Sequence, residues 1–137
     1  MLLEDDELLP LFIKYMQSDN LDVMNNACWL ISNMINDVPD AIVRKVIQAD
    51  HCIEYYIDAI NEIEDEDLVN YMIMALLKCI QVDSGLKELY INKNLKEILE
   101  DNYYINKSSD AYKILLSILR KSSRKGNEFA NKRRRKR

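Results

Sequence analysis

The sequence predicts an all-α protein, and two observations carry this prediction. Glycine and proline occur only twice each among 137 residues, whereas tight β-turns use these residues often. Apolar residues recur with helical spacing in one segment after another, and Leu21–Asp37 is the clearest case. A chain of this length has the size of a single domain.

The segment Leu21–Asp37 is predicted to form one amphipathic helix. At about 100° per residue, its apolar side chains fill roughly half of the helical wheel. The other half carries Asp22, Asn25, Asn26, Ser32, Asn33, Asn36 and Asp37. Trp29, the only tryptophan, lies within this polar half, one turn before Asn33. Trp29 is either a core residue or, as its position on the wheel favours, part of an exposed binding face.

The first half of the chain contains three further expected helices. Leu8–Gln17 is short and apolar, and Ser18-Asp19-Asn20 interrupts the pattern and is able to cap the helix at Leu21. Pro39–Gln48 is a short helix with proline near its first turn, where proline is tolerated. Cys52–Ile63 is apolar, and His51-Cys52 closes one helix and starts the next.

The second half contains four expected helices. The acidic run Glu64–Asp67 suits a helix N-terminus, because carboxylates stabilise the positive end of the helix dipole. The helix that follows, Leu68–Gln81, is apolar nearly all round and is therefore expected at the centre of the fold. The remaining helices are Ser84–Ile91, Asn94–Asp101 and the long Asp110–Lys121. We expect a helical domain over residues 1–121 and a disordered basic tail over 122–137.

The helices form an internal repeat of short, medium and long helix, with a period near 43 residues. A shift of 45 residues places Asn25 on Asn70, Trp29 on Met74, Asn33 on Lys78 and Asn36 on Gln81. A further shift of 43 residues places Lys113, Ser117, Lys121 and Arg124 in the same register. A polar stripe repeated on the long helices predicts that these helices pack side by side and expose one face along a groove.

The run Asn26–Asn33, NACWLISN, closely resembles the third helix of a repeat in the importin-α family, whose hallmark is Trp-x-x-x-Asn. The resemblance covers about residues 8–121, as one armadillo repeat lacking its first helix followed by two complete repeats. It implies a right-handed α-solenoid of about three armadillo-like repeats. The later two units match the family only in period and apolar pattern.

The resemblance also implies a binding chemistry for the groove. Asn33 would hydrogen-bond the backbone of an extended peptide, and Trp29 would contact the aliphatic stem of a Lys or Arg. Asn25, Asn36 and Asp22 are secondary contacts, and the groove continues over Met74, Lys78 and Gln81. Met74/Lys78 and Ser117/Lys121 stand where further Trp/Asn pairs would be, so one rung of the peptide-binding ladder is intact.

The charge of the chain is strongly asymmetric. Residues 1–106 hold 7 basic and 21 acidic side chains, a net charge of −14, whereas residues 107–137 hold 12 basic and 2 acidic ones, a net charge of +10. Arg120-Lys121, ten intervening residues and then Lys132, Arg133, Arg134, Arg135, Lys136 and Arg137 resemble a bipartite nuclear localisation signal. The alternatives are a phosphate-binding arm for nucleic acid, a segment that folds back on the acidic body, or a solubilising tail.

Two hypotheses of function follow. The first is a protein-binding module that takes an extended peptide or partner protein along its concave groove, acts in nuclear protein import in nucleus and cytoplasm, and meets importin through its tail. The second is a nucleic-acid- or ribosome-associated factor that binds through the tail. We expect no enzyme, because no glycine-rich phosphate loop or Ser/His/Asp set is present.

No cofactor or metal site is expected either, since the chain has one histidine, His51, and no Cys-x-x-Cys. The odd number of cysteines, Cys28, Cys52 and Cys79, favours reduced thiols in an intracellular protein. No membrane contact is expected, because no apolar run approaches the about 18 residues of a membrane span.

The first repeat unit has an apolar end. No helix precedes Leu8, Leu9 and Leu11 to cover them, and solenoids usually need capping units. We expect the chain to dimerise, to dock on a larger partner, or to cover this end with an irregular cap formed by Met1–Glu7.

Overall fold

The computed structural model describes residues 8–121, which form eight helices and no strands. The all-α prediction is confirmed for this part of the chain. The helices are α1 (Leu8–Met16), α2 (Leu21–Asn36), α3 (Asp40–Gln48), α4 (Cys52–Ile60), α5 (Glu66–Val82), α6 (Leu86–Asn92), α7 (Leu95–Asp101) and a last helix over residues 110–121.

Each long helix begins at a side chain that caps it. Asn20 Oδ1 accepts the backbone N–H groups of Asp22 and Val23 at 3.0 and 3.2 Å. Asp65 Oδ1 accepts the N–H of Leu68 at 3.2 Å, and Ser109 Oγ accepts the N–H of Tyr112 at 3.2 Å. The caps explain where the long helices start, because each satisfies N–H groups that have no partner within the helix.

The turns into α4 and α7 share one unusual conformation. His51 precedes α4 with φ 57°, and Asn94 precedes α7 with φ 58°. Histidine and asparagine tolerate the left-handed region better than most residues, so these turns form without glycine. The predicted α4 extended to Ile63, but the helix ends at Ile60 and residues 61–62 form a turn.

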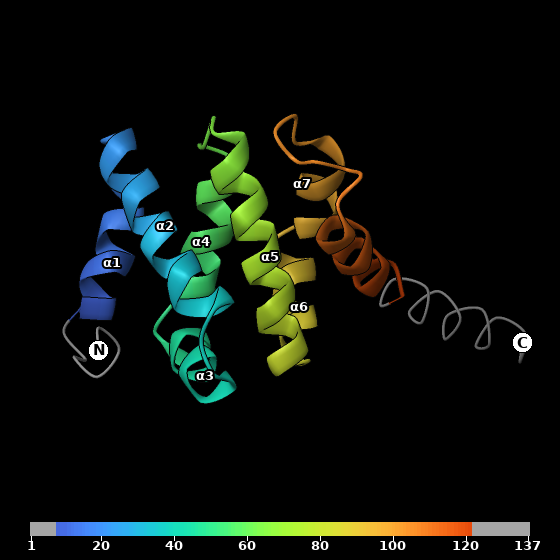
Figure 1. The fold of residues 1–137 in the computed structure, drawn as a ribbon, viewed down its shortest axis with the longest axis horizontal. Helices are drawn as coiled ribbons and strands as arrows, with labels where there is room; N and C mark the ends of the chain where they lie inside the picture. Colours follow the sequence, from blue (N-terminus) through green and yellow to red (C-terminus); the bar gives the residue numbers. More distant parts are fainter. Residues whose placement is uncertain (1–7, 122–137) are drawn as a thin grey trace, which may run out of the picture.

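Along the long axis of the molecule, α1 and α2 lie at one end, α5 lies near the middle and the last helix lies at the other end (Figure 1). α2 packs against α1 and α5, and α5 also packs against α3 and α6. α5 is the central helix, as its composition predicted. Nine of its residues are buried: Leu68, Val69, Met72, Ile73, Ala75, Leu76, Leu77, Cys79 and Ile80.

The end of the molecule formed by α1 is partly open. Leu8 and Leu9 are half-buried, while Leu11 and Tyr15 are 40% and 43% exposed. The predicted cap over residues 1–7 and the predicted tail over residues 122–137 lie outside the described residues. None of the helices described is long and apolar enough to cross a membrane.

Candidate functional site

The predicted binding residues Trp29 and Asn33 meet a third side chain, Tyr71 of α5. Tyr71 Oη donates a hydrogen bond of 2.7 Å to Asn33 Oδ1, and the contact is exposed. The ring of Tyr71 lies beside the indole of Trp29, with 5.3 Å between centroids and 38° between the planes. Trp29 is half-buried and Asn33 is exposed. The packing of α2 on α5 thus brings two aromatic rings and one amide together at the surface.

Two other asparagines of α2 are used differently. Asn36 Nδ2 donates a 3.2 Å hydrogen bond to the backbone carbonyl of Tyr71, so this amide helps to hold α2 against α5. Asn25 is half-buried, and its Oδ1 is buried with no hydrogen-bond partner among the described residues. Asp22, at the first turn of α2, is exposed.

The predicted continuation of the surface on α5 has mixed chemistry. Met74 is 50% exposed and Gln81 is exposed. Lys78 Nζ lies 3.2 Å from Asp40 Oδ1, at the N-terminus of α3. This carboxylate partly offsets the charge of Lys78 and so reduces the repulsion that the lysine would exert on a basic ligand.

Asn70 of α5 fixes the loop before the last helix. Its Nδ2 donates to the carbonyls of Tyr104 and Glu66 at 3.0 and 2.8 Å, and its Oδ1 accepts the N–H of Asn106 at 2.8 Å. Beside this contact lies a cavity of about 400 Å³. It is lined by Glu66, Asp67, Asn70, Met74, Asn106, Ser109, Asp110 and Ala111. Met74 therefore borders a hollow between α5 and the last helix.

The last helix supplies the third set of predicted positions. Lys113, Ser117 and Lys121 are exposed, as is the neighbouring Ile114. Arg120 Nη2 lies 3.3 Å from Glu100 Oε2 of α7. Arg120 and Lys121 are thus the only members of the predicted localisation signal within the described residues; the rest, Lys132, Arg133, Arg134, Arg135, Lys136 and Arg137, lie outside them.

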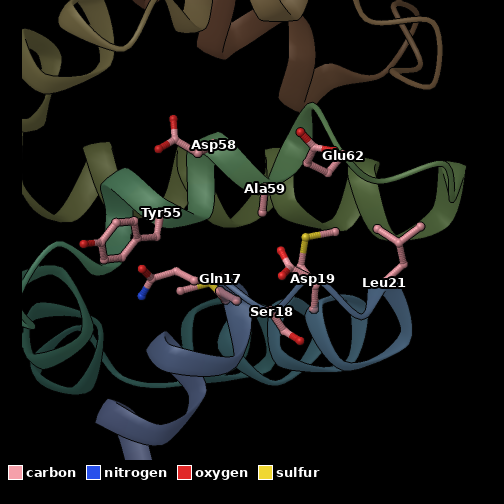
Figure 2. A pocket seen from close by; sticks show the side chains of 10 residues that line it. Gln17, Ser18, Asp19, Leu21, Tyr55, Asp58, Ala59 and Glu62 are labelled. Atoms are coloured by element: carbon pink, nitrogen blue, oxygen red, sulfur yellow. The ribbon is translucent and has the colours of Figure 1, made fainter.

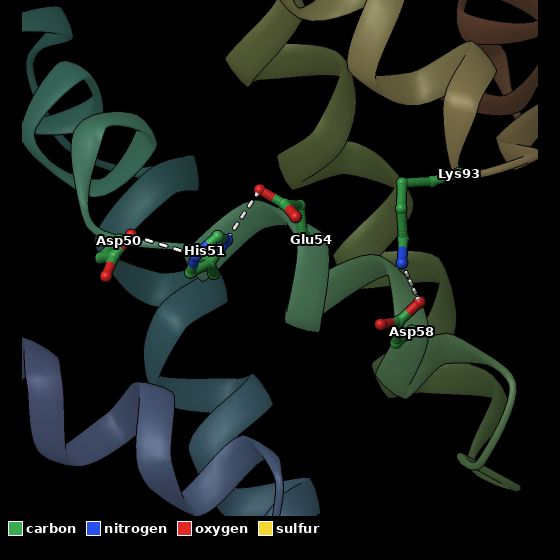
Figure 3. Close-up of polar contacts among 5 residues, drawn as sticks. All are labelled: Asp50, His51, Glu54, Asp58 and Lys93. Carbon is green, nitrogen blue, oxygen red and sulfur yellow. Dashed lines mark hydrogen bonds and ion pairs between the residues drawn. The ribbon is translucent and has the colours of Figure 1, made fainter.

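A second cavity of about 400 Å³ lies between the α1–α2 corner and α4 (Figure 2). Of the residues that line it, Met16 and Met24 are buried, and Leu21 is 54% exposed. Asp19, Asp58 and Glu62 also line it. Of these carboxylates, Asp58 Oδ1 lies 2.6 Å from Lys93 Nζ (Figure 3). Sequence reasoning did not find this cavity, because its lining comes from three separate helices.

The single histidine is engaged in local contacts (Figure 3). His51 Nε2 lies 3.3 Å from Asp50 Oδ1, and its Nδ1 lies 3.2 Å from Glu54 Oε1. This arrangement agrees with the prediction that His51 marks the junction of two helices.

The three cysteines are free, buried thiols. Removal from water raises the pKa of Cys28, Cys52 and Cys79 to about 12 in each case. Thiols in such surroundings are poor nucleophiles, because the thiolate is the reactive form. They behave as small apolar side chains of the core.

Tyr71 is the residue at this surface that sequence reasoning missed. It follows Asn70, which the predicted repeat aligns with Asn25, and the same shift of 45 residues aligns Tyr71 with Asn26 on the polar half of α2. That register placed Tyr71 near the exposed face, but only the packing of α5 on α2 placed its ring against Trp29.

Comparisons with protein-family models, with curated proteins and with solved structures found no match to this chain. The resemblance to importin-α armadillo repeats therefore stays a prediction from the residues named above.

Proposed function

We propose that this protein is a protein-binding module that takes an extended segment of a partner along the exposed side of α2, α5 and the last helix. The single observation that carries the proposal is the surface cluster of Trp29, Asn33 and Tyr71. An exposed amide held beside two aromatic rings offers both hydrogen bonding and apolar contact to a peptide chain.

The proposed architecture is an α-solenoid of about three armadillo-like repeats. The periodic positions of two local features support it. The caps of the long helices, Asn20, Asp65 and Ser109, are 45 and 44 residues apart. The left-handed residues His51 and Asn94 are 43 residues apart and precede the middle helices of consecutive units. Local signals that recur at the repeat period are expected when each unit is one supersecondary structure.

The chemistry of the surface favours a neutral or basic segment. Asp22 is exposed on α2, Asp37 is exposed directly after it, and Glu66 and Asp67 are exposed at the start of α5. Carboxylates at the edges of a binding surface attract basic partners and repel acidic ones. Trp29 offers an indole to a cationic side chain, an interaction of about 0.5–2 kcal/mol depending on desolvation.

The test is selection of peptides on the full chain. A random dodecapeptide display library is selected on the wild-type protein, and the affinity of the best peptide is measured by fluorescence anisotropy. Asn33→Ala should weaken binding about three- to tenfold, the worth of one hydrogen bond. Asn92→Ala, which removes an exposed asparagine from α6, is the matched control and should bind like the wild type.

Two results would count against the proposal. If no peptide is enriched over a library selected on an unrelated helical protein, the module does not bind extended segments. If Asn33→Ala and Asn92→Ala bind the peptide with equal affinity, binding occurs elsewhere on the molecule.

The proposal also includes a role in nuclear protein import, in nucleus and cytoplasm. This part rests on the resemblance to importin-α repeats.

The charge of the C-terminal region favours a second function, binding of nucleic acid. Residues 107–137 carry a net charge of +10, and Lys113 and Lys121 are exposed on the last helix. Such binding should weaken steeply with salt, since each neutralised phosphate releases counterions. Deletion of residues 124–137 should abolish RNA association. RNA association that survives the deletion and is insensitive to salt would reject this function.

A further inference from the structure

The contact between Asn33 and Tyr71 leaves a specific pair of hydrogen-bonding groups at the surface. Tyr71 Oη uses its proton on Asn33 Oδ1 at 2.7 Å. A phenol oxygen retains acceptor lone pairs after donating, and an asparagine amide nitrogen carries two N–H donors. As far as the described residues go, Asn33 Nδ2 remains a donor and Tyr71 Oη remains an acceptor.

The polarity of this pair is fixed by its own hydrogen bond. Because the Tyr71 proton points to Asn33 Oδ1, the amide is oriented with its nitrogen on the other side. The ring of Tyr71 lies beside the indole of Trp29, with 5.3 Å between centroids, and the backbone carbonyl of Tyr71 accepts a hydrogen bond from Asn36 Nδ2. A donor and an acceptor on neighbouring helices are therefore held close together before any ligand arrives.

Asn33 differs in this respect from the other asparagines nearby. Asn70 uses both ends of its amide within the molecule, on Glu66, Tyr104 and Asn106. Asn36 uses its nitrogen on the Tyr71 carbonyl. The buried Oδ1 of Asn25 is shielded from a ligand. Asn33 is exposed, and among the described residues its Nδ2 has no hydrogen-bond acceptor.

We propose that Asn33 and Tyr71 together bind the backbone of one residue of the extended segment, whose C=O and N–H point to the same side in an extended chain. Asn33 Nδ2 donates to a backbone C=O of the ligand, and Tyr71 Oη accepts a backbone N–H. This inference rests on the proposed function and assigns Tyr71 as a contact residue of the same surface. The pair compensates for Met74 and Lys78, which stand where α5 would otherwise carry a second Trp/Asn pair.

Binding of backbone groups has a consequence for specificity. The peptide C=O and N–H are present at nearly every residue, so the pair fixes the direction and register of the segment and leaves side-chain preference to Trp29 and the carboxylates nearby. Acceptors that carry full negative charge are disfavoured by the exposed Asp37, four residues after Asn33.

The experiment combines a backbone change in the ligand with a hydroxyl deletion in the protein. The probe is the best dodecapeptide selected on the wild-type chain, synthesised as a series in which each backbone N–H is replaced by an ester oxygen. The proteins are full-length wild type, Tyr71→Phe and Tyr103→Phe; Tyr103 is 89% exposed and serves as the hydroxyl-deletion control.

The proposal expects one ester position to weaken binding to the wild type about three- to tenfold, as for one lost hydrogen bond. The same ester substitution should not weaken binding to Tyr71→Phe any further, because this variant lacks the acceptor. It should weaken binding to Tyr103→Phe as much as binding to the wild type. If every ester substitution keeps its full effect in Tyr71→Phe, Tyr71 accepts no backbone N–H and the inference is wrong.

The outcomes separate this inference from the proposed function. If Asn33→Ala weakens binding but no ester substitution in the peptide is coupled to Tyr71→Phe, the inference is wrong and the proposed function stands. If no peptide can be selected, both are wrong. If Tyr71→Phe is too unstable to assay, an NMR measurement on the wild-type protein tests the inference instead. The side-chain NH₂ resonances of Asn33 should shift on binding of the peptide, and unchanged resonances would overturn the inference.

Discussion

A buried pair of hydroxyl groups is a notable polar feature of the core. Ser32 is the buried polar residue of α2, and its Oγ lies within hydrogen-bond distance of both the Cys28 carbonyl and the Tyr56 hydroxyl. Tyr56 is fully buried in α4, and burial raises its pKa well above the usual value. The two hydroxyls satisfy each other in an apolar surrounding, which links α2 to α4.

Removal of the Ser32 hydroxyl should therefore destabilise the protein more than such a small substitution usually does. Ser32→Ala leaves the Tyr56 hydroxyl buried beside a methyl group, and we expect the free energy of unfolding to fall by about 1–3 kcal/mol. The measurement is chemical denaturation followed by circular dichroism. Ser117→Ala, the same substitution at an exposed position, should change stability by less than about 0.5 kcal/mol.

The three thiols should be unreactive in the native protein. With pKa values of about 12, Cys28, Cys52 and Cys79 are almost entirely protonated at pH 8. A thiol reagent such as dithionitrobenzoate should modify none of them in the folded chain and all three in denaturant. Rapid modification of one thiol without denaturant would contradict their burial.

The same burial predicts loss of stability in alkali. The folded-state pKa of each thiol is about 12, above the ordinary value of 9.0, so the folded state holds these protons more tightly. The contribution of the protonated thiols to the free energy of unfolding is complete below about pH 9. It falls as the pH rises toward 12, because the unfolded chain then binds fewer protons than the folded one. The midpoint of thermal unfolding should decrease between pH 8.5 and 10.5, and less steeply for Cys79→Ala.

The long helices depend on contacts at their N-terminal ends as much as on their apolar faces. Asn20, Asp65 and Ser109 cap them, and Asn70, one turn into α5, holds the loop that leads to the last helix. Within each of these elements the local signal is short and polar, whereas the apolar stripe decides which side faces the core.

Asn70 should control the order of the loop before the last helix. Asn70→Ala removes the side-chain bonds to Tyr104 and Asn106, and we expect faster hydrogen exchange at the Asn106 amide with a stability loss of about 1–3 kcal/mol. Asn26→Ala, at an exposed position of α2, is the control. Unchanged exchange at Asn106 would show that other contacts hold the loop.

At the scale of the whole molecule, α5 connects the two halves. It contacts α2 and α3 on one side and α6 on the other, and its side chains form the middle of a continuous apolar core. The helices described should therefore unfold together, because the two halves share this core through α5.

A substitution that creates a cavity beside α5 tests whether the helices unfold together. Leu76 is fully buried, and Leu76→Ala is expected to reduce the free energy of unfolding by about 2–5 kcal/mol. The transition should stay single when followed by circular dichroism and by Trp29 fluorescence. Leu11→Ala, at a position that is 40% exposed, should cost much less. Two separate transitions for Leu76→Ala would show that the halves fold independently.

The sequence by itself determined the all-α class, the positions of the helices and the central place of α5. Helical periodicity and caps such as Asn20 are local, so they can be identified from neighbouring residues. It also predicted that Trp29 and Asn33 belong together, since four residues separate them on one helical face.

Only the tertiary structure decided what these residues touch. Two contacts depend on how far α5 is rotated and shifted against α2 and α3. They are the contact of Tyr71 with Trp29 and Asn33, and the ion pair of Lys78 with Asp40. That rotation and shift result from the packing of the whole core, and the pattern within any one helix does not contain them.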